Sequence, residues 1–352
     1  MPRVAVLGAG CIGQWVGGHL ASAGVEVVLI GRSVLQRTVT AQKLRLTDVE
    51  RDVNGFALSL DVPGVRLEVC FDVEQALRQD DFDAVFVCLK MYDNQSAALL
   101  ERLRHDTVIV SLQNGVDNQR ILSGLLPKHT VAAGMVPYGV VEVAPGHFRR
   151  GTYGSLAFTD KLPAALTAAL RSSGLAVELY NDDDMCAVQW CKLVINLGNA
   201  LNALVGQPLA SCMKDRGYRR LMAATWEEGL AVTKAKSIRI QGDINGQPLA
   251  KAAMFLRFPT FLLTLGQRIK GVKDFDSSYH SSMFYDLEGR RETEVNELNE
   301  RIVQIANEVQ MRAPINELLA RMVREAQRAR QGSPRVPIEE MVGQAERVAL
   351  GS

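Results

Sequence analysis

A lysine and three asparagines interrupt an otherwise apolar segment at residues 190–204, which reads WCKLVINLGNALNAL. At about 100° per residue, Lys192, Asn196 and Asn199 fall on one narrow arc of a helix, with Asn202 at its edge. A solvated helix face usually carries charged pairs three or four residues apart, whereas this arc carries one cation and amides. Two interpretations remain open: an amphipathic helix with unusual polar residues, or a helix whose polar arc faces a binding site.

The second interpretation has a definite chemistry. A lysine ammonium stabilises negative charge that develops on a carbonyl oxygen, and it also supplies a proton to that oxygen. Partial burial of Lys192 on an apolar helix would lower its pKa and ease the proton transfer. An amide such as Asn196 holds polar substrate groups without adding charge. Asn199 and Asn202 are less settled, because they either line the same site or lie outside it.

A second dense group of polar residues, HSSMFYDLEGRRETEVNELN, spans residues 280–299. Glu294 has a structural explanation in this stretch. Thr293 would cap the next helix, Asn296 would take the capping-box position, and Glu294 would lie in the first helical turn. Alternatively, Glu294 faces the same site as Lys192, where its charge would keep the lysine protonated.

The first element expected to hold a cofactor is the sequence GAGCIG at residues 8–13. A GxGxxG pattern alone is weak evidence, but here a strand precedes it, a helix follows it, and the βαβ unit has about 30 residues. Gly8 permits the tight turn, Gly10 lets the backbone approach a pyrophosphate, and Gly13 allows close packing of the helix on the strand. We therefore predict a dinucleotide site in this turn, with Cys11 and Ile12 included.

The end of the second predicted strand indicates which dinucleotide binds. Enzymes that use NAD tend to place Asp or Glu there for the ribose 2′-hydroxyl, but this chain reads VVLIGRS, with Arg32 and Ser33. Glu26 lies near the start of that strand and cannot do the same work. A guanidinium and a hydroxyl suit a 2′-phosphate, so we predict NADPH. The alternative is that Arg32 is an ordinary surface arginine.

Polar residues also follow two later predicted strands, with Lys90 after the fourth and Gln113 and Asn114 after the fifth. Ligands of open α/β sheets bind beyond the carboxyl ends of the strands. Lys90, Gln113 and Asn114 are therefore expected near the cofactor or the substrate. For Asn114 and the following Gly115, turn formation alone is an equally good explanation.

The chain as a whole predicts an α/β protein with two domains. β-branched runs alternate with helical patterns in residues 1–181, which indicates a Rossmann-like domain with a parallel sheet. The segments VVEVAPGHFRRG and YGSLAFT are expected to extend that sheet at one edge as antiparallel strands. Helical periods dominate residues 182–352, which predicts an all-helical domain, and a ligand site is expected at the junction of the two domains.

Composition excludes several classes of function. The 352 residues are 47% hydrophobic and 22% charged, with a net charge of +1, so we expect no nucleic-acid partner. No segment is long and apolar enough to predict a membrane span, and the first strand begins too early for a signal peptide. The six scattered cysteines form no metal-binding pattern and indicate reduced thiols in a cytoplasmic protein. A homodimer is the default expectation for the assembly.

Taken in order, these motifs resemble the ketopantoate reductases (2-dehydropantoate 2-reductases). The resemblance covers nearly the whole chain: VLGAGCIG, LK followed by Tyr92, LQNG, WCKLVIN, and SSM…DLEGRRETEVNELN. It implies a Rossmann domain joined to a helical domain, with the active site between them. It also implies reduction of a 2-keto acid to a 2-hydroxy acid by NADPH.

The resemblance carries roles to matching positions. It implies that Lys192 is the general acid and that Glu294 contacts substrate and supports catalysis. Substrate would contact Asn114, Asn196 and Ser282, and we add Asn199 as a candidate. Cofactor would contact the glycine turn, Arg32, Lys90, Asn114 and Glu294. No metal is expected.

The chain also departs from the family pattern. The family's second helix asparagine falls on Ala200, its glycine after ELN is Glu300, and QNGVGN reads QNGVDN with Asp117. Residues 236–275 are longer than a minimal member needs. These departures put the identity of the keto acid in doubt more than the type of reaction.

The sequence leaves two alternative functions open, and two further segments carry structural predictions. The alternatives are a two-domain 3-hydroxyacid dehydrogenase and a non-catalytic NADPH sensor, although a sensor has no need of Lys192 and Glu294 together. The arginines of RMVREAQRARQG are expected to form a solvated or salt-bridged surface. The tail after Ser333 is expected to be a loosely attached extension.

Overall fold

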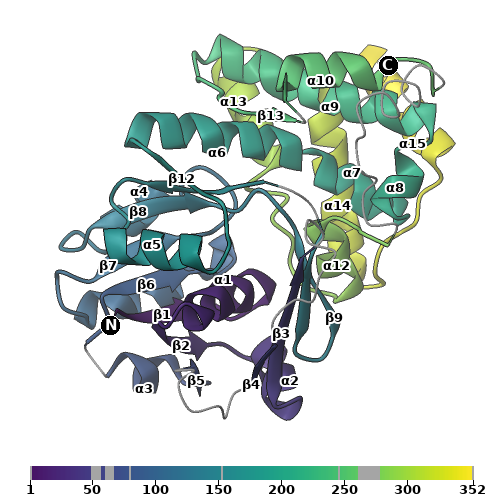
Figure 1. Cartoon of the computed structure of the whole chain (residues 1–352). Coiled ribbons are helices and arrows are strands. Elements are labelled where there is room, and N and C mark those ends of the chain that lie inside the picture. Colours follow the sequence, from purple (N-terminus) through teal and green to yellow (C-terminus); the bar gives the residue numbers. More distant parts are fainter. Residues whose placement is uncertain are drawn as a thin grey trace. The chain divides into compact units, whose positions relative to one another are not determined.

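The structure is a computed structural model, and it describes residues 2–48, 57–59, 67–78, 81–151, 154–244, 246–260 and 278–350. The chain divides into two compact units, Met1–Cys186 and Ala187–Ser352. Figure 1 colours the first unit from purple to teal and the second from teal to yellow. The α/β fold class predicted from the sequence is confirmed, with a Rossmann-like sheet in the first unit and helices in the second.

Eight strands form the main sheet of the first unit, in the order β12-β11-β8-β7-β6-β1-β2-β5. The strands from β5 to β8 are mutually parallel, whereas β11 is antiparallel to β8. Their bounds are β1 Arg3–Leu7, β2 Glu26–Ile30, β5 Leu67–Cys70, β6 Ala84–Val87, β7 Val108–Ser111, β8 Val131–Met135, β11 Leu156–Thr159 and β12 Val177–Tyr180. The parallel sheet predicted from β-branched runs is therefore confirmed.

Helices cover both faces of this sheet (Figure 1). They are α1 Cys11–Ser22, α2 Ser33–Thr40, α3 Val73–Leu77, the 3₁₀ helix η1 Met91–Arg102, α4 Asn118–Leu125 and α5 Ala164–Ser172. In β1, Val4 and Val6 belong to the core shared with α1 and α5, whereas Ala5 and Leu7 belong to the core shared with α3, η1 and α4. Strands buried on both faces need continuous apolar runs, which is why the sequence pattern was easy to interpret.

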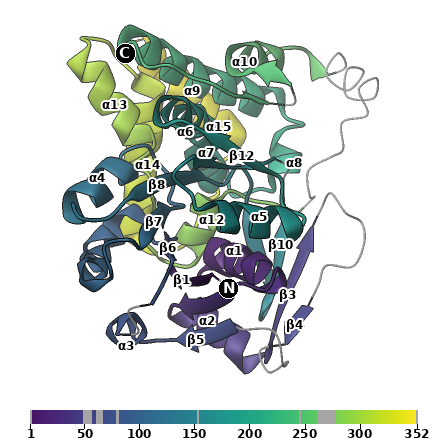
Figure 2. The same ribbon diagram turned by 60° about the vertical axis from the view of Figure 1, so that its left-hand side comes forward.

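A second, four-stranded sheet stands beside α1 and α2, in the order β4-β3-β10-β9 (Figure 2). Its strands are β3 Lys43–Asp48, β4 Ala57–Ser59, β9 Val140–Ala144 and β10 His147–Arg150. The VVEVAPGHFRRG segment forms the predicted antiparallel hairpin, but β10 pairs with β3 and not with the main sheet. The prediction for that segment was wrong because the sheet buries Leu44, Leu46 and Phe148 in a tertiary contact beside α1. YGSLAFT does extend the main sheet, as β11.

The described part of the second unit is helical apart from a two-stranded hairpin. Its elements are α6 Asp182–Asn196, α7 Gly198–Val205, α8 Leu209–Cys212, α9 Arg216–Ala235, β13 Asp243–Ile244, β14 Gln247–Pro248, α10 Leu249–Leu256, α12 Ser282–Glu288, α13 Asn299–Glu308, α14 Pro314–Ala329 and α15 Ile338–Leu350. Helix α6 begins in the first unit. Of the longer region 236–275, residues 245 and 261–275 lie outside the described part of the chain.

The expectation of a loose tail after Ser333 was wrong. The Ser333 hydroxyl donates to the Ala203 carbonyl at 2.7 Å, and the Val336 N–H donates to the Leu204 carbonyl at 2.9 Å. These are carbonyls of the last turn of α7, which have no partner within their own helix. Met341 of α15 is fully buried. The tail is therefore docked through bonds that a linear pattern does not reveal.

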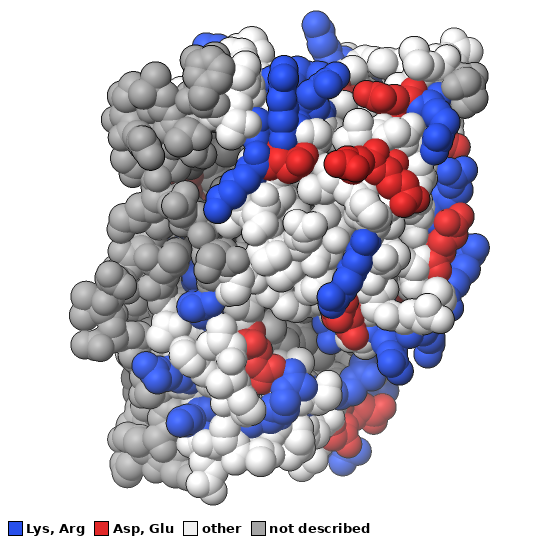
Figure 3. Space-filling model, turned by 90° about the vertical axis from the view of Figure 1, so that its right-hand side faces the viewer, with Lys and Arg blue, Asp and Glu red and all other residues white. Residues whose placement is uncertain are grey.

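Charge is evenly mixed on the face of the molecule shown in Figure 3, where basic and acidic side chains lie interleaved among uncharged ones. Part of the arginine-rich face of α14 is salt-bridged, because Arg324 donates to Glu300 of α13 at 2.6 Å. Arg321 and Arg328 are exposed. The prediction of a solvated or salt-bridged surface is confirmed.

No helix among the described residues is long and apolar enough to cross a membrane.

Candidate active site

The glycine turn after β1 has the geometry that a dinucleotide requires. Gly8 has φ +97, and a Cβ there would lie 2.8 Å from the Cys88 carbonyl carbon. A Cβ on Gly13 would clash with the Gly8 carbonyl oxygen and lie 3.0 Å from Val6 Cγ1. At Gly10, in contrast, nothing lies within 4 Å of an added Cβ. Two glycines are therefore required by packing, and the third keeps open the space that a pyrophosphate would fill.

The sheet order gathers the predicted cofactor residues of the first unit at one edge. Strands β2 and β6 flank β1 and run parallel to it, and β7 follows β6. The turns that carry Gly8, Arg32, Lys90 and Asn114 all follow the carboxyl ends of these strands. The chain leaves β1 on one side to β2 and later returns on the other side as β6, which is the switch point where ligands of such sheets bind.

Arg32 lies at the start of α2, where it is the N-terminal boundary residue and is exposed. The preceding Gly31 packs on the glycine turn, since a Cβ there would lie 3.0 Å from Ala9 Cβ. Glu26 lies at the opposite end of β2 and is 3.9 Å from the Arg3 guanidinium. The β2–α2 turn therefore offers a guanidinium and the Ser33 hydroxyl, with no carboxylate in the turn itself.

Asn114 and its neighbours have separate roles. Gly115 has φ +89, so turn formation explains the glycine. The buried Asn118 Nδ2 donates to the Asn114 carbonyl at 2.6 Å and fixes that turn. Gln113 is buried and accepts from the Ser111 hydroxyl at 3.2 Å. Gln113 thus contributes to local structure, whereas the half-buried Asn114 stays a predicted ligand contact.

Lys192 lies in α6 and is partly buried. Burial lowers the pKa of its ammonium to about 8. Burial also raises the pKa of the Cys191 thiol to about 11, so the thiol stays neutral. A lysine with a pKa near neutrality is suited to give up a proton during a reaction.

The apolar run that carries Lys192 is two helices and not one, because α6 ends at Asn196 and α7 begins at Gly198. Side chains from elsewhere in the unit bind the carbonyls at this break. Trp226 Nε1 donates to the Ile195 carbonyl at 3.1 Å, and Asn299 Nδ2 donates to the Leu197 carbonyl at 3.0 Å. A single helical wheel over this run does not predict these two contacts.

Asn299 belongs to a buried polar network that sequence reasoning missed. Its Nδ2 also donates to Asn316 Oδ1 at 3.0 Å, and Asn316 Nδ2 donates to Glu228 at 2.8 Å. The backbone N–H groups of Ile315 and Asn316 each donate to Glu228 at 2.9 Å. Burial raises the pKa of Glu228, and these hydrogen bonds oppose the shift. In the sequence, Asn299 ends the segment ELN and Asn316 ends the segment PIN. Only the contacts between α9, α13 and α14 show that these two asparagines belong to one network.

Asn202 is explained by structure. It is 1% exposed, and both ends of its amide are used. Its Oδ1 accepts from the Ser281 N–H at 2.8 Å, and its Nδ2 donates to the Gln207 carbonyl at 3.0 Å. Ser281 caps α12 by accepting from the Phe284 N–H, which leaves the exposed Ser282 as the serine of this pair that is available to a ligand. Asn199, partly exposed, remains a candidate.

The helix-cap explanation for Glu294 was wrong. Helix α13 begins at Asn299, and Thr293 instead donates from its N–H and its hydroxyl to Gln327 Oε1, at 2.9 and 3.0 Å. Glu294 therefore lies in the turn before the helix, and its side chain is 4% exposed. A buried carboxylate outside a helix terminus needs another reason to be there. Asn196, at 6% exposure in α6, is the other buried polar candidate.

Two family models together match most of the chain. Residues 4–161 match the family model described as ketopantoate reductase PanE/ApbA, and residues 184–327 match the model of the C-terminal part of the same family. The chain belongs to the ketopantoate reductase family. It is an oxidoreductase of the 2-dehydropantoate 2-reductase type that acts on CH–OH groups.

Relatives match along nearly their full length. The 2-dehydropantoate 2-reductase of Halobacterium salinarum is 27% identical over 339 residues, which cover 93% of this chain and 99% of the relative. That of Archaeoglobus fulgidus is 26% identical over 329 residues, covering 92% and 97%. The crystal structure of a PanE/ApbA family ketopantoate reductase from Ralstonia eutropha JMP134 has a TM-score of 0.73 and 29% identity, covering 94% and 99%.

A D-mandelate dehydrogenase solved with NADH and anilino(oxo)acetate shares the fold, with a TM-score of 0.70 at 19% identity over 93% of this chain and 99% of that one. The fold is therefore shared with a dehydrogenase of another name. Three residues that depart from the sequence pattern of the ketopantoate reductase family have the following environments in the structure. Ala200 is fully buried, Glu300 is paired with Arg324, and Asp117 forms an ion pair with Arg120 at 3.2 Å.

Proposed function

We propose that this protein reduces 2-dehydropantoate (ketopantoate) to pantoate with NADPH, as a step of pantothenate biosynthesis in the cytoplasm. The observation that carries the proposal is the partly buried Lys192, whose pKa burial lowers to about 8. It lies one helical turn from the buried Asn196 in a chain whose relatives are 2-dehydropantoate 2-reductases.

The residues at the carboxyl edge of the main sheet fit a dinucleotide. The open space at Gly10 and the first turn of α1, with Cys11 and Ile12, would accept the pyrophosphate. Arg32 and Ser33 would bind the 2′-phosphate that distinguishes NADPH from NADH. Lys90, Asn114 and Glu294 complete the proposed cofactor contacts. When bound, the nicotinamide supplies the hydride.

The protein residues of the second unit would handle the charge and the proton. Lys192 donates a hydrogen bond to the keto oxygen, stabilises the negative charge that builds there, and gives its proton to the new hydroxyl. Asn196 and Ser282 orient the polar groups of the substrate, and Asn199 is the further candidate. Glu294, which is buried, is proposed to contact the substrate and to support catalysis.

A related 2-keto acid is the second candidate substrate. Ala200 stands where the family pattern has an asparagine, and it cannot bind a substrate hydroxyl. Asn202 cannot replace that amide, because both ends of its side chain bond within the protein. Asn199 is the nearby amide whose side chain is partly exposed. The site therefore favours a 2-keto acid but offers fewer amide contacts than the family pattern implies.

Initial-rate assays with NADPH and a panel of 2-keto acids test the proposal, with ketopantoate compared against unsubstituted, branched and aromatic members. We expect ketopantoate to have the highest kcat/KM. A higher value for another keto acid would replace the substrate and leave the reaction in place. Absence of NADPH oxidation with every keto acid would instead favour a sensor. Light scattering of the same sample tests the expected homodimer.

A further inference from the structure

Two buried polar side chains of the first unit have no place in the roles given so far. Gln14 of α1 and Thr38 of α2 are both 0% exposed. A buried amide or hydroxyl costs free energy unless it is hydrogen-bonded. Their partners therefore show which parts of the fold these two residues connect.

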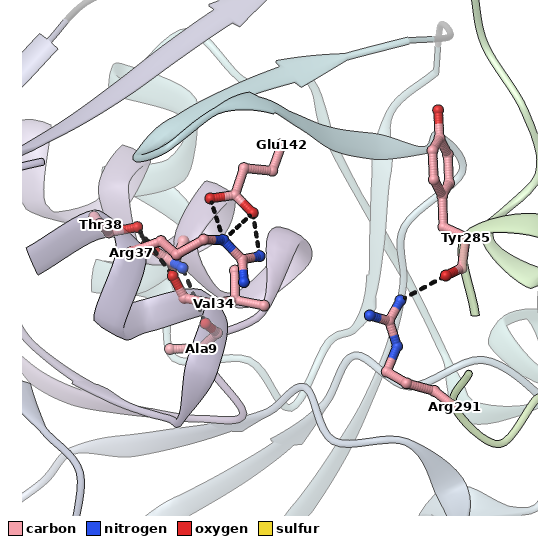
Figure 4. A network of polar contacts seen from close by, with 8 residues as sticks. Ala9, Val34, Arg37, Thr38, Glu142, Tyr285 and Arg291 are labelled. Carbon is pink, nitrogen blue, oxygen red and sulfur yellow. Dashed lines mark hydrogen bonds and ion pairs between the residues drawn. The ribbon is translucent and has the colours of Figure 1, made fainter. Parts of the chain in front are cut away.

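Gln14 and Thr38 link α2 to the glycine turn. Gln14 Nε2 donates to the Ala9 carbonyl at 3.0 Å, and the Thr38 hydroxyl donates to Gln14 Oε1 at 2.6 Å. Because a carbonyl oxygen only accepts hydrogen bonds, Gln14 must direct its Nε2 to Ala9, and this leaves Oε1 for Thr38. Figure 4 shows Thr38 and Ala9 on the two sides of this connection.

The residue next to Thr38 in α2 forms an ion pair. Arg37 Nε donates to both carboxylate oxygens of Glu142 in β9, at 3.0 and 3.1 Å, and its Nη2 also donates to Glu142 (Figure 4). The carboxylate raises the pKa of Arg37. Bidentate pairs fix orientation well, but the Arg37 side chain is 48% exposed and its contribution is reduced by solvent. The buried Gln14–Thr38 hydrogen bond therefore fixes the position of α2 more firmly than the exposed Arg37–Glu142 ion pair does.

Arg32 and Ser33 open the helix that this link anchors, and Gly31 packs directly on Ala9. The pyrophosphate and the 2′-phosphate are both attached to the adenosine ribose of NADPH. Both can be bound only if the glycine turn and the start of α2 keep a fixed separation. We propose that Gln14 and Thr38 are positioning residues for cofactor selection, which hold Arg32 and Ser33 at the distance that a 2′-phosphate requires.

This inference rests on the proposed use of NADPH, and it is tested by binding both cofactors to matched variants. Thr38→Val keeps the shape and removes the hydroxyl, whereas Thr38→Ser keeps the hydroxyl. Dissociation constants for NADPH and NADH are measured by fluorescence titration, and Tm is recorded for each variant. Gln14→Leu provides a second way to break the link if Thr38→Val does not fold.

For Thr38→Val we expect NADPH affinity to fall on the order of tenfold, from one lost hydrogen bond and one unpaired buried oxygen. NADH affinity should change by less than about threefold, since NADH has no 2′-phosphate to position. Thr38→Ser should stay near wild type for both. An equal loss for both cofactors, or no loss for either, would overturn the inference, because the link would then serve the fold alone.

Arg32→Ala in the same experiment separates the two proposals. If wild type prefers NADPH and Arg32→Ala removes that preference while Thr38→Val retains it, only the positioning role fails. If wild type binds NADH and NADPH with equal affinity, the proposal that NADPH is the cofactor fails. The positioning role then fails as well, because there is no cofactor selectivity for Gln14 and Thr38 to support.

Discussion

The two units build their candidate sites from different material. In the first unit the site is largely backbone: a glycine turn, the carboxyl ends of parallel strands and the first turn of α1. In the second unit it is side chains, with Lys192 and Asn196 on α6, Ser282 on α12 and Glu294 in a turn. The backbone site needs positions without a side chain, so that a ligand can approach the main chain. The side-chain site needs functional groups that other residues hold in place.

This difference predicts opposite sensitivities. Adding a single carbon should damage the first unit, because its glycines leave space for a ligand or for a neighbouring strand. Removing atoms should damage the second unit, because buried amides such as Asn299 and Asn202 bind backbone groups next to the segments that carry the candidate side chains. Four substitutions test the comparison, beginning with the largest expected effect.

Lys192→Ala removes the proposed proton donor. We expect kcat to fall on the order of 100-fold or more, with NADPH affinity little changed. Because burial lowers the pKa of Lys192 to about 8, the wild-type kcat/KM should fall as pH rises through about 8, when the protonated acid is lost. The variant should lose that pH dependence. Lys234→Ala, at an exposed position of α9, is the control, and normal turnover in Lys192→Ala would falsify the assignment.

Gly10→Ala adds one carbon where the protein itself leaves room. We expect Tm near that of wild type, because nothing lies within 4 Å of the new Cβ, but dinucleotide affinity reduced on the order of tenfold or more, as the pyrophosphate loses its space. Gly124→Ala adds the same carbon at another open position and serves as the control. If Gly10→Ala binds NADPH normally, the turn is not the pyrophosphate site.

Asn299→Ala removes the donor that binds the Leu197 carbonyl at the α6–α7 break. The loss leaves buried polar groups of Leu197 and Asn316 without a partner, so we expect unfolding free energy to fall by about 1–3 kcal/mol. Chemical denaturation measures this loss, and kcat should fall as well because the break positions Lys192 and Asn196. The exposed Asn296→Ala is the matched control. Equal stability of the two variants would show that the network does not support the break.

Ser333→Ala tests whether the tail is docked, with the smallest expected effect. The Ala203 carbonyl would lose its hydroxyl partner, so the free energy of unfolding should fall by about 1 kcal/mol. Ser211→Ala, at an exposed position of α8, should change it by much less. An unchanged value for Ser333→Ala would restore the expectation of a loose extension.

Much of the first unit could be predicted from the sequence because its determinants are local. Apolar runs define strands buried on both faces, Gly8 must adopt a positive φ, and Gly13 must admit the turn beside it. The second sheet could not be predicted, since β10 pairs with β3, which is about 100 residues away in the chain. Hairpin chemistry determines that β9 and β10 pair, but not which third strand they join.

The second unit shows where local patterns stop being informative. A helical wheel placed Lys192, Asn196 and Asn199 on one arc, but the break at Leu197 divides that arc between α6 and α7. Capping rules placed Glu294 in a helix, but α13 begins at Asn299, and Thr293 donates to the distant Gln327 side chain. In both cases side chains from elsewhere in the unit bind groups at the point where the local pattern failed.

By itself, then, the sequence determined the types of residue available for chemistry, the dinucleotide turn and the alternation of strands and helices. These depend on backbone conformation, side-chain size and apolar period, which act over a few neighbouring residues. Tertiary structure alone decided that Asn202 is structural, that Ser282 and not Ser281 is exposed, and that Glu294 is buried outside a helix. Those outcomes depend on which buried groups find hydrogen-bond partners, and the partners lie far away in the chain.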